Sequence, residues 1–128
     1  MCGIAGFIDL SRSPAENAAQ LEAMLACIVH RGPDDHGAWV EDGVALGFRR
    51  LSIVDLSTAG HQPMISASGR LVMIFNGEIY NYPALRDGLA AAGLVFRGPS
   101  DTEVLPELID PAGLAAARSR CVGVFALA

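Results

Sequence analysis

The chain has 128 residues and a formal net charge of −5 at pH 7; 52% of its residues are hydrophobic and 18% are charged. This size and composition predict a single globular domain over residues 1–128. Because Lys and Arg do not cluster, we expect neither nucleic acid nor an anionic membrane surface as a partner. The apolar run 88–96 is far below the roughly 20 residues of a membrane span, and the N-terminus lacks the basic start of a signal peptide. We therefore expect a cytoplasmic protein.

The cysteines Cys2, Cys27 and Cys121 are an odd number, without C-x-x-C spacing or nearby pairs of histidines. This usage predicts reduced thiols and indicates neither a disulfide framework nor a zinc site. We expect no metal and no cofactor.

The first elements are predicted by apolar patterns and by capping residues. Residues 3–10 are typical of a buried strand. Residues 13–16, Ser-Pro-Ala-Glu, form a capping box with Pro at the first helical position. The helix that follows places its apolar residues at helical spacing and ends before the turn-forming segment 31–35. These apolar residues are Leu21, Met24, Leu25 and Ile28.

The middle of the chain predicts short strands and one long loop. Strands are expected at 38–41 and 44–49, joined by a hairpin turn at Asp42 and Gly43. Residues 51–69 are expected to form a loop, a length that in compact domains is usually functional or disordered. An apolar strand is expected at 71–75.

The last third predicts helices and a final strand. A helix at 83–92 should end at Gly93, and a second capping box at 100–103 should begin another helix, which Pro106 and Pro111 shorten. Residues 122–128 predict an apolar strand. Strands and helices in this mixed order indicate an α+β layered domain.

Cys2 carries the first chemical signal. Removal of the initiator Met would leave a thiol and a free α-amino group on one residue. A free Cys titrates near pH ~8.5 and an α-amino group near ~7.7–8, so the amine can accept the thiol proton at neutral pH. By itself a Cys at this position is more often a buried residue at the start of a strand.

Several further motifs accompany Cys2, and together with it they resemble, in order, the class II glutamine amidotransferase domain of the N-terminal-nucleophile hydrolases. The likeness is to the amino-terminal glutaminase domain of asparagine synthetase B and its relatives, and it implies an αββα sandwich. The segments that carry the resemblance are Cys2-Gly3-Ile4-Ala5-Gly6, His30-Arg31-Gly32-Pro33-Asp34, Arg50-Leu51-Ser52-Ile53-Val54-Asp55, His61-Gln62-Pro63-Met64, Asn76-Gly77-Glu78-Ile79-Tyr80-Asn81 and Ser100-Asp101-Thr102-Glu103-Val104.

The resemblance implies hydrolysis of L-glutamine to glutamate and ammonia through a thioester on Cys2. Asn76 and the Gly77 N–H match the donors of the oxyanion hole, whose loss typically costs ~10²–10³ in rate. In isolation, Asn-Gly would instead indicate a turn.

The resemblance also implies a pocket for the two charged ends of glutamine. Arg50 matches the ligand of the α-carboxylate, Glu78 and Asp101 match ligands of the α-amino group, and Val54 contributes a backbone carbonyl. The alternatives are a solvated strand-end charge for Arg50 and a helix first-turn carboxylate for Asp101.

The remaining polar residues receive supporting roles. Arg31 is expected to order the site, and the histidines are expected to serve surface or loop packing. Cys27, on the first helix, is expected to lie in the protein core, whereas Cys121 receives no role. Phe48 stands where the family often has a polar residue.

The family domain continues with further strands beyond the segment 123–126 and then reaches an ATP-dependent synthetase domain, whose Ser-Gly-Gly-x-Asp-Ser signature this sequence lacks. We therefore expect a shortened sandwich that passes ammonia to a separate synthetase or ligase. The uncharged strand 122–128 favours self-association or docking on such a partner. The rival functions are an accessory or regulatory subunit that binds glutamine or a protein, and hydrolysis of another amide.

Overall fold

The computed structural model describes residues 2–52 and 58–128. The described strands are β1 (Gly3–Ile8), β2 (Asp35–Glu41), β3 (Val44–Arg50), β4 (Met64–Ile65), β5 (Val72–Met73), β6 (Phe75–Ile79) and β7 (Gly123–Leu127). The described helices are α1 (Pro14–Cys27), α2 (Tyr82–Ala91), α3 (Val104–Ala112) and α4 (Leu114–Arg120), with short 3₁₀ turns η1 (Val29–Arg31) and η2 (Thr58–Gly60).

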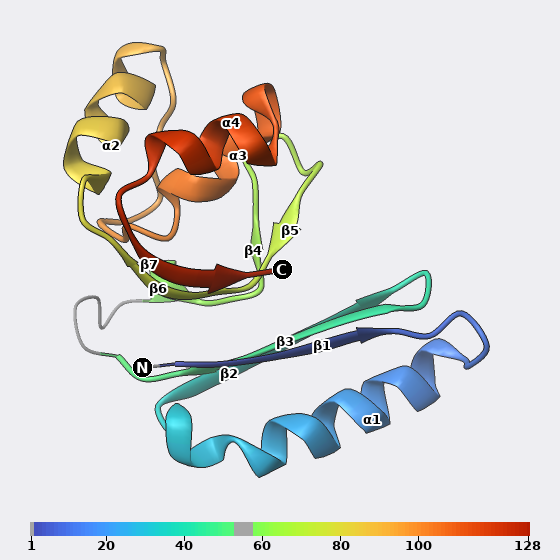
Figure 1. Ribbon diagram of the computed structural model, residues 1–128. Helices are drawn as coiled ribbons and strands as arrows, with labels where there is room; N and C mark the ends of the chain where they lie inside the picture. The colour runs from blue at the N-terminus through green and yellow to red at the C-terminus, as the bar shows by residue number, and fades with distance from the viewer. Residues whose placement is uncertain (1, 53–57) are drawn as a thin grey trace.

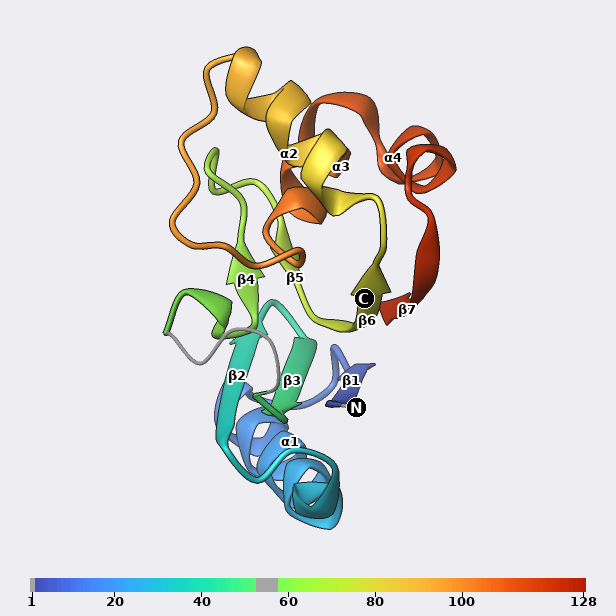
Figure 2. The ribbon, with the colours of Figure 1, turned by 90° about the vertical axis from the view of Figure 1, so that its left-hand side faces the viewer.

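These elements lie in layers. Helix α1 covers one face of an antiparallel sheet of order β1-β3-β2, which we call the first sheet. The antiparallel pairs β4-β5 and β6-β7 lie on the opposite side of that sheet, and α2, α3 and α4 lie beyond them (Figure 1). The view in Figure 2 shows the same separation, with α1 at one end of the molecule and the other helices at the other end. The predicted α+β class is confirmed.

The first sheet and α1 are held together by an apolar face and a well-capped helix. The predicted capping box is confirmed, because the Glu16 N–H donates to Ser13 Oγ and the Ser13 N–H donates to the Glu16 carboxylate at 2.9 Å. Leu21 and Leu25 are fully buried against Ala45 of β3. This small core fixes which face of the first sheet points away from α1.

The side chains of β3 alternate between the two faces of the first sheet. A Cβ at Gly47 would lie 2.9 Å from side-chain atoms of Leu21 and Leu25, and Arg49 Nε donates to the Leu25 carbonyl at 3.1 Å. Gly47 and Arg49 therefore face α1. Phe48 and Arg50, which alternate with them, face the other layer and are buried.

The second apolar core lies between β6 and the later helices. Phe75 and Ile79 of β6 are buried in a cluster with residues of α2 and α3, including Leu85 and Val104. Since strand side chains alternate, Asn76 lies on the opposite face of β6, which is turned toward the first sheet. The strand predicted at 122–128 is confirmed as β7, which pairs antiparallel with β6.

The strand predicted at 71–75 is wrong in its extent. The segment divides into β5, which pairs with β4, and β6, which pairs with β7, so the chain changes partner at Ile74. β6 then continues through the polar residues up to Ile79, beyond the apolar run. The predicted loop 51–69 also contains strand β4, whereas its residues 53–57 lie outside the described residues.

The second predicted capping box does not form. Helix α3 begins at Val104, and its N-cap residue Glu103 makes no side-chain cap. The Glu103 carboxylate instead accepts the backbone N–H groups of Arg97 and Gly98 at 2.8 and 3.1 Å, so it closes the preceding loop. Helix α3 ends at Gly113, whose φ is +82°, and α4, which was not predicted, follows it.

None of the helices within residues 2–52 and 58–128 has the length and apolarity needed to cross a bilayer.

Candidate functional site

Cys2 lies at the leading end of β1 and is half-buried. A Cβ on its neighbour Gly3 would lie 2.9 Å from Ile28 on the α1 side, so alternation turns the Cys2 side chain to the other face of the first sheet. Cys2 Sγ accepts the Leu51 N–H at 3.4 Å and lies 3.7 Å from the Leu51 carbonyl. Arg31 Nε donates to the Cys2 carbonyl at 3.1 Å, which agrees with the ordering role expected for Arg31.

Arg50 ends β3, the strand beside β1, and lies on the same face of the first sheet as Cys2. The register pairs Gly3 with Arg49, so Cys2 and Arg50 come from the same end of two adjacent strands. Arg50 is only 8% exposed, which contradicts the solvated strand-end alternative. Burial of a charged group is costly unless it is paired.

The edge of β6 that points away from β7 carries the backbone groups of alternate residues. Ile74 and Tyr80 form backbone hydrogen bonds with Ala128 and Val122 of the β7 segment. In an antiparallel ladder the residues between such pairs turn their N–H and C=O groups to the other edge. Phe75, Gly77 and Ile79 occupy these positions, and we call this edge the outer edge of β6.

Side chains occupy the outer edge on both sides of Gly77. The Gln62 side chain forms two hydrogen bonds with Phe75, accepting its N–H at 2.6 Å and donating to its carbonyl at 3.2 Å. The Asp101 Oδ2 atom accepts the N–H of Ile79 at 3.1 Å. The N–H of Gly77 lies between these two contacts, where a bound acceptor would meet it.

Gly77 is required by its backbone. Its φ is +155°, and a Cβ there would lie 2.2 Å from the Val124 carbonyl oxygen of β7. Any larger residue would push β6 away from β7 or rotate the peptide group. The Asn-Gly pair thus belongs to a strand and does not form the turn that its composition alone would indicate.

The remaining predicted site residues border the same region. Glu78 is exposed on β6, two residues after Asn76, so both side chains lie on the strand face turned toward the first sheet. Asp101 is half-buried and reaches the end of β6 through its bond to Ile79. This contact contradicts a simple helix first-turn role, because α3 begins only at Val104. Val54 lies outside the described residues.

The two halves of the site come from different layers and face each other. Cys2 and Arg50 point from the first sheet toward β6, and Asn76 and Glu78 point from β6 toward the first sheet. Strands β1 and β6 are in contact. Figure 1 shows the N-terminal end of β1 and the end of β6 on the same side of the molecule. The fold therefore places a thiol and a guanidinium on one of two facing layers and an amide and carboxylates on the other.

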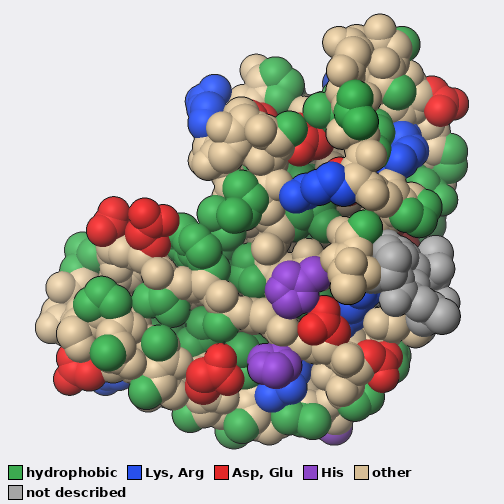
Figure 3. Space-filling view, turned by 180° about the vertical axis from the view of Figure 1, so that it is seen from behind, with side chains coloured by type: hydrophobic (Ala, Val, Ile, Leu, Met, Phe, Trp, Pro, Cys, Tyr) green, Lys and Arg blue, Asp and Glu red, His purple; other side chains and the backbone are tan. Residues whose placement is uncertain are grey.

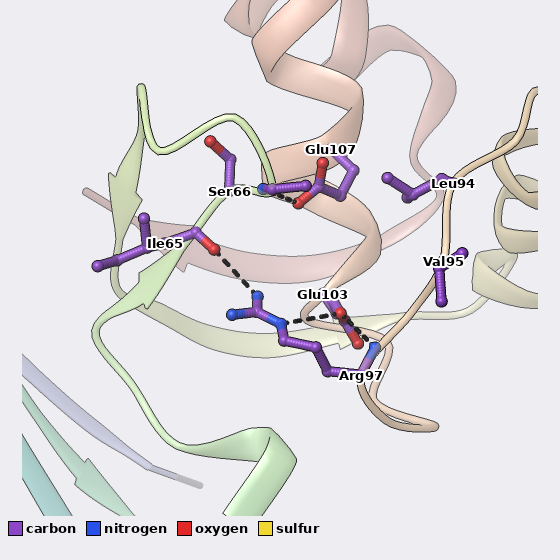
Figure 4. Close-up of a pocket in the computed structure, with 8 residues that line it drawn as sticks. Ile65, Ser66, Leu94, Val95, Arg97, Glu103 and Glu107 are labelled. Carbon is purple, nitrogen blue, oxygen red and sulfur yellow. Dashed lines mark hydrogen bonds and ion pairs between the residues drawn. The ribbon is translucent and has the colours of Figure 1, made fainter.

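Two cavities lie among the described residues, the first within the second layer and the second between the two layers. One, of about 310 Å³, is lined by the β4 segment and α3; there Arg97 donates to the Glu103 carboxylate and to the Ile65 carbonyl (Figure 4). The other, of about 480 Å³, is an apolar groove bordered by β1, β3, Ile74 and Ala128. The view from behind shows a notch on this side with hydrophobic side chains along it (Figure 3). Neither cavity includes a predicted site residue.

Sequence reasoning mislocated one cysteine and assigned no role to one residue of the site. Cys27, expected in the core, is exposed, because it lies at the end of α1 on the side away from Leu25. Burial raises the pKa of the Cys121 thiol, which favours its neutral form. The sequence places Gln62 in a motif without assigning it a role, although it is buried and bonded to β6. Its pairing with Phe75 depends on tertiary structure that no local pattern reports.

Comparison with known protein families gives one match over the whole chain. The model of a glutamine amidotransferase domain matches residues 1–128. The match covers both halves of the interlayer site, from Cys2 on β1 to Asp101 before α3.

Curated relatives are similar over most of the chain. The glutamine-hydrolyzing asparagine synthetase 1 of Bacillus subtilis is 44% identical over 82% of this chain. The amidase chry2 of Gibberella zeae is 42% identical over 89%. A putative glutamine-hydrolyzing asparagine synthetase 2 of Methanocaldococcus jannaschii is 34% identical over 88%. The matches span only 17%, 18% and 24% of these relatives, respectively.

Proposed function

Because the chain belongs to the glutamine amidotransferase domain family, we propose that it hydrolyses the side-chain amide of L-glutamine with Cys2 as the nucleophile. One observation carries the proposal. The thiol and the guanidinium lie on the face of the first sheet that is turned toward the second layer, where β6 carries an amide side chain on its facing side and a glycine N–H on its outer edge. A substrate with a reacting carbonyl at one end and charged groups at the other matches this arrangement.

The proposed reaction uses the N-terminal residue as both nucleophile and base. The Cys2 thiol loses its proton to its own α-amino group as Sγ attacks the amide carbon. The tetrahedral intermediate collapses with proton transfer to the leaving nitrogen, which departs as ammonia and leaves a glutamyl thioester. Water then attacks the thioester and releases glutamate and the thiol. The Leu51 N–H, 3.4 Å from Sγ, is suited to stabilise developing negative charge on sulfur.

The oxyanion would be held by Asn76 and Gly77. Negative charge develops on the former carbonyl oxygen, and fixed donors stabilise it more than mobile ones do because they need no reorganisation. The Gly77 N–H is held on both sides by side-chain bonds to Phe75 and Ile79. This restraint supports the assignment of Gly77 as one donor and Asn76 as the other.

The charged ends of glutamine would be bound by groups from both layers. Arg50 is proposed to bind the α-carboxylate through two parallel hydrogen bonds. Glu78 and Asp101 are proposed to bind the α-ammonium group. Asp101 already uses one carboxylate oxygen for Ile79, so its second oxygen would meet the substrate. Val54 is proposed to add a backbone carbonyl.

We further propose that the fold is an αββα sandwich of the N-terminal-nucleophile type. The layer order of α1, the first sheet, the paired strands and the later helices supports this assignment. Since the matches span 17% to 24% of the relatives' length, the acceptor of the ammonia is a separate proposal. We propose that the ammonia passes to a separate synthetase or ligase, and that the chain docks on such a partner or self-associates.

A glutaminase assay on the purified protein, with intact mass spectrometry, tests the central proposal. We expect glutamate and ammonia in equal amounts from protein whose mass begins at Cys2. Cys2→Ala should abolish turnover and keep measurable glutamine binding, because only the nucleophile is lost. Cys27→Ala is the matched control, an exposed thiol outside the site that should leave turnover unchanged. Turnover by protein that retains Met1, or by Cys2→Ala, would contradict the mechanism.

A further inference from the structure

Gln62 contacts both layers of the site, and no step of the proposed reaction involves it. It lies in the segment between η2 and β4 and is 3% exposed. Its side-chain amide forms both hydrogen bonds that a neighbouring strand would form with Phe75, one from the Phe75 N–H and one to the Phe75 carbonyl. A single side chain thus takes the place of a strand residue beside β6.

The backbone of Gln62 is seated on the first sheet. A Cβ at Gly37 of β2 would lie 2.0 Å from the Gln62 carbonyl oxygen, so the absence of a side chain at Gly37 lets this segment lie directly on the strand. The preceding residue is also tied to β2, because His61 Nδ1 lies 2.8 Å from Asp35 Oδ2. The main chain of Gln62 is therefore anchored on one layer and its side chain holds the other.

We propose that Gln62 is a positioning residue for the oxyanion hole. Phe75 immediately precedes Asn76, and the peptide that follows carries the Gly77 N–H. By fixing Phe75 relative to the first sheet, Gln62 sets the position of both oxyanion donors relative to Cys2. This inference rests on the proposed glutamine hydrolysis and adds a residue that touches neither substrate nor nucleophile.

The proposal predicts a kinetic effect with a particular pattern. Gln62→Met keeps the length of the side chain but removes both bonds to Phe75. A shift of about 1 Å in a catalytic group can cost about 100-fold in rate, so kcat should fall ~10- to 100-fold. KM should change less than about 3-fold, because glutamine is bound mainly by groups in contact with its charged ends. Alkylation of Cys2 by iodoacetamide needs no oxyanion hole and should keep its wild-type rate.

Asn81 provides a matched control. Its side chain also forms two hydrogen bonds with backbone groups, donating to the Arg120 carbonyl at 2.9 Å and accepting the Val122 N–H at 2.8 Å. This contact is more exposed and joins the start of α2 to the segment before β7. Asn81→Ala should lower Tm while leaving kcat within about 2-fold of wild type. At a temperature where both variants are folded, the kcat of Gln62→Met should be lower than that of Asn81→Ala.

The outcomes are separable. If wild-type protein hydrolyses glutamine and folded Gln62→Met matches Asn81→Ala in kcat, the positioning role is overturned and the proposed function stands. If Gln62→Met lowers kcat and also slows Cys2 alkylation, the substitution has distorted the site as a whole, and the positioning role is overturned as well. If the wild type shows no Cys2-dependent glutaminase activity, both proposals fail. Should Gln62→Met not fold, Gln62→Glu keeps the shape and the acceptor for the Phe75 N–H but loses the donor to the Phe75 carbonyl, and the same split between kcat and alkylation is expected.

Discussion

The first sheet and β6 support the same candidate site by different means. In the first sheet, β3 has strands on both sides, and α1 seals one face with Leu21 and Leu25. Within residues 2–52 and 58–128, β6 has β7 as its one strand partner, and its outer edge is bonded instead by the side chains of Gln62 and Asp101. One half of the site is thus held by a backbone ladder and the other by individual side chains.

The two halves of the candidate site therefore depend on different kinds of contact. The ladder of the first sheet gives Cys2 and Arg50 fixed positions that depend little on any one side chain. The outer edge of β6 leaves the Gly77 N–H free of a neighbouring strand, at the cost of depending on a few residues. Substitutions on the two sides should therefore affect different kinetic parameters.

The largest effect among these substitutions is expected on the β6 side. Asn76→Ala should lower kcat by ~10²–10³, about 2.7–4 kcal/mol of transition-state stabilisation, because one donor to the developing oxyanion is lost. KM should remain close to the wild-type value. Steady-state glutaminase kinetics measure both parameters. A rise in KM with unchanged kcat would move Asn76 from the oxyanion hole to ground-state binding.

A smaller effect is expected from the first sheet. Arg50→Ala should raise KM by ~10- to 100-fold, since a hydrogen bond to a charged group contributes about 1.5–3 kcal/mol. The value of kcat should change less, because the α-carboxylate is bound in both the ground and transition states. Arg50→Lys is the control that keeps the charge and loses the planar fork. Glutamine titrations that find equal affinity in wild type and Arg50→Ala would remove Arg50 from the binding site.

The smallest effect is expected at the N-terminus of α1, which carries none of the proposed catalytic or binding residues. Ser13→Ala removes the N-cap of α1 and should cost about 1 kcal/mol of stability, with kcat and KM unchanged. Hydrogen bonds from Ser13 also lower the pKa of Glu16, so the share of this stability that comes from the Glu16 carboxylate is present at neutral pH and is lost as the pH falls below the usual Glu range, through the lowered pKa. Thermal unfolding at neutral and acidic pH measures the difference, and an equal Tm deficit at both pH values would contradict this linkage.

The sequence predicted the first layer well because its signals are local. The capping box at Ser13 and the helical spacing of Leu21 and Leu25 need no distant partner to specify α1. The hairpin turn at Asp42 and Gly43 is confirmed between β2 and β3. Although β2 begins earlier than expected, at Asp35, its pairing with β3 is the one that the turn predicted.

The second layer was predicted less well because its structure depends on distant contacts. The polar residues Asn76 and Glu78 belong to a strand only because β7, far along the chain, pairs with them. Glu103 does not form the predicted cap because its carboxylate accepts the backbone N–H groups of Arg97 and Gly98 instead. The position and chemistry of Cys2 made it a candidate from sequence, whereas the role of Gln62 requires knowing that its neighbour is Phe75.

The outer edge of β6 also has a consequence for solubility. A strand edge with unpaired backbone groups is a template on which another polypeptide can add, a common start of aggregation. An added strand would need the N–H and C=O groups of several successive outward-facing residues. Gln62 occupies both groups of Phe75 and Asp101 occupies the N–H of Ile79, so the Gly77 backbone lies between two blocked positions. A peptide strand added there would have to displace the Gln62 and Asp101 side chains, so this edge disfavours intermolecular β-pairing.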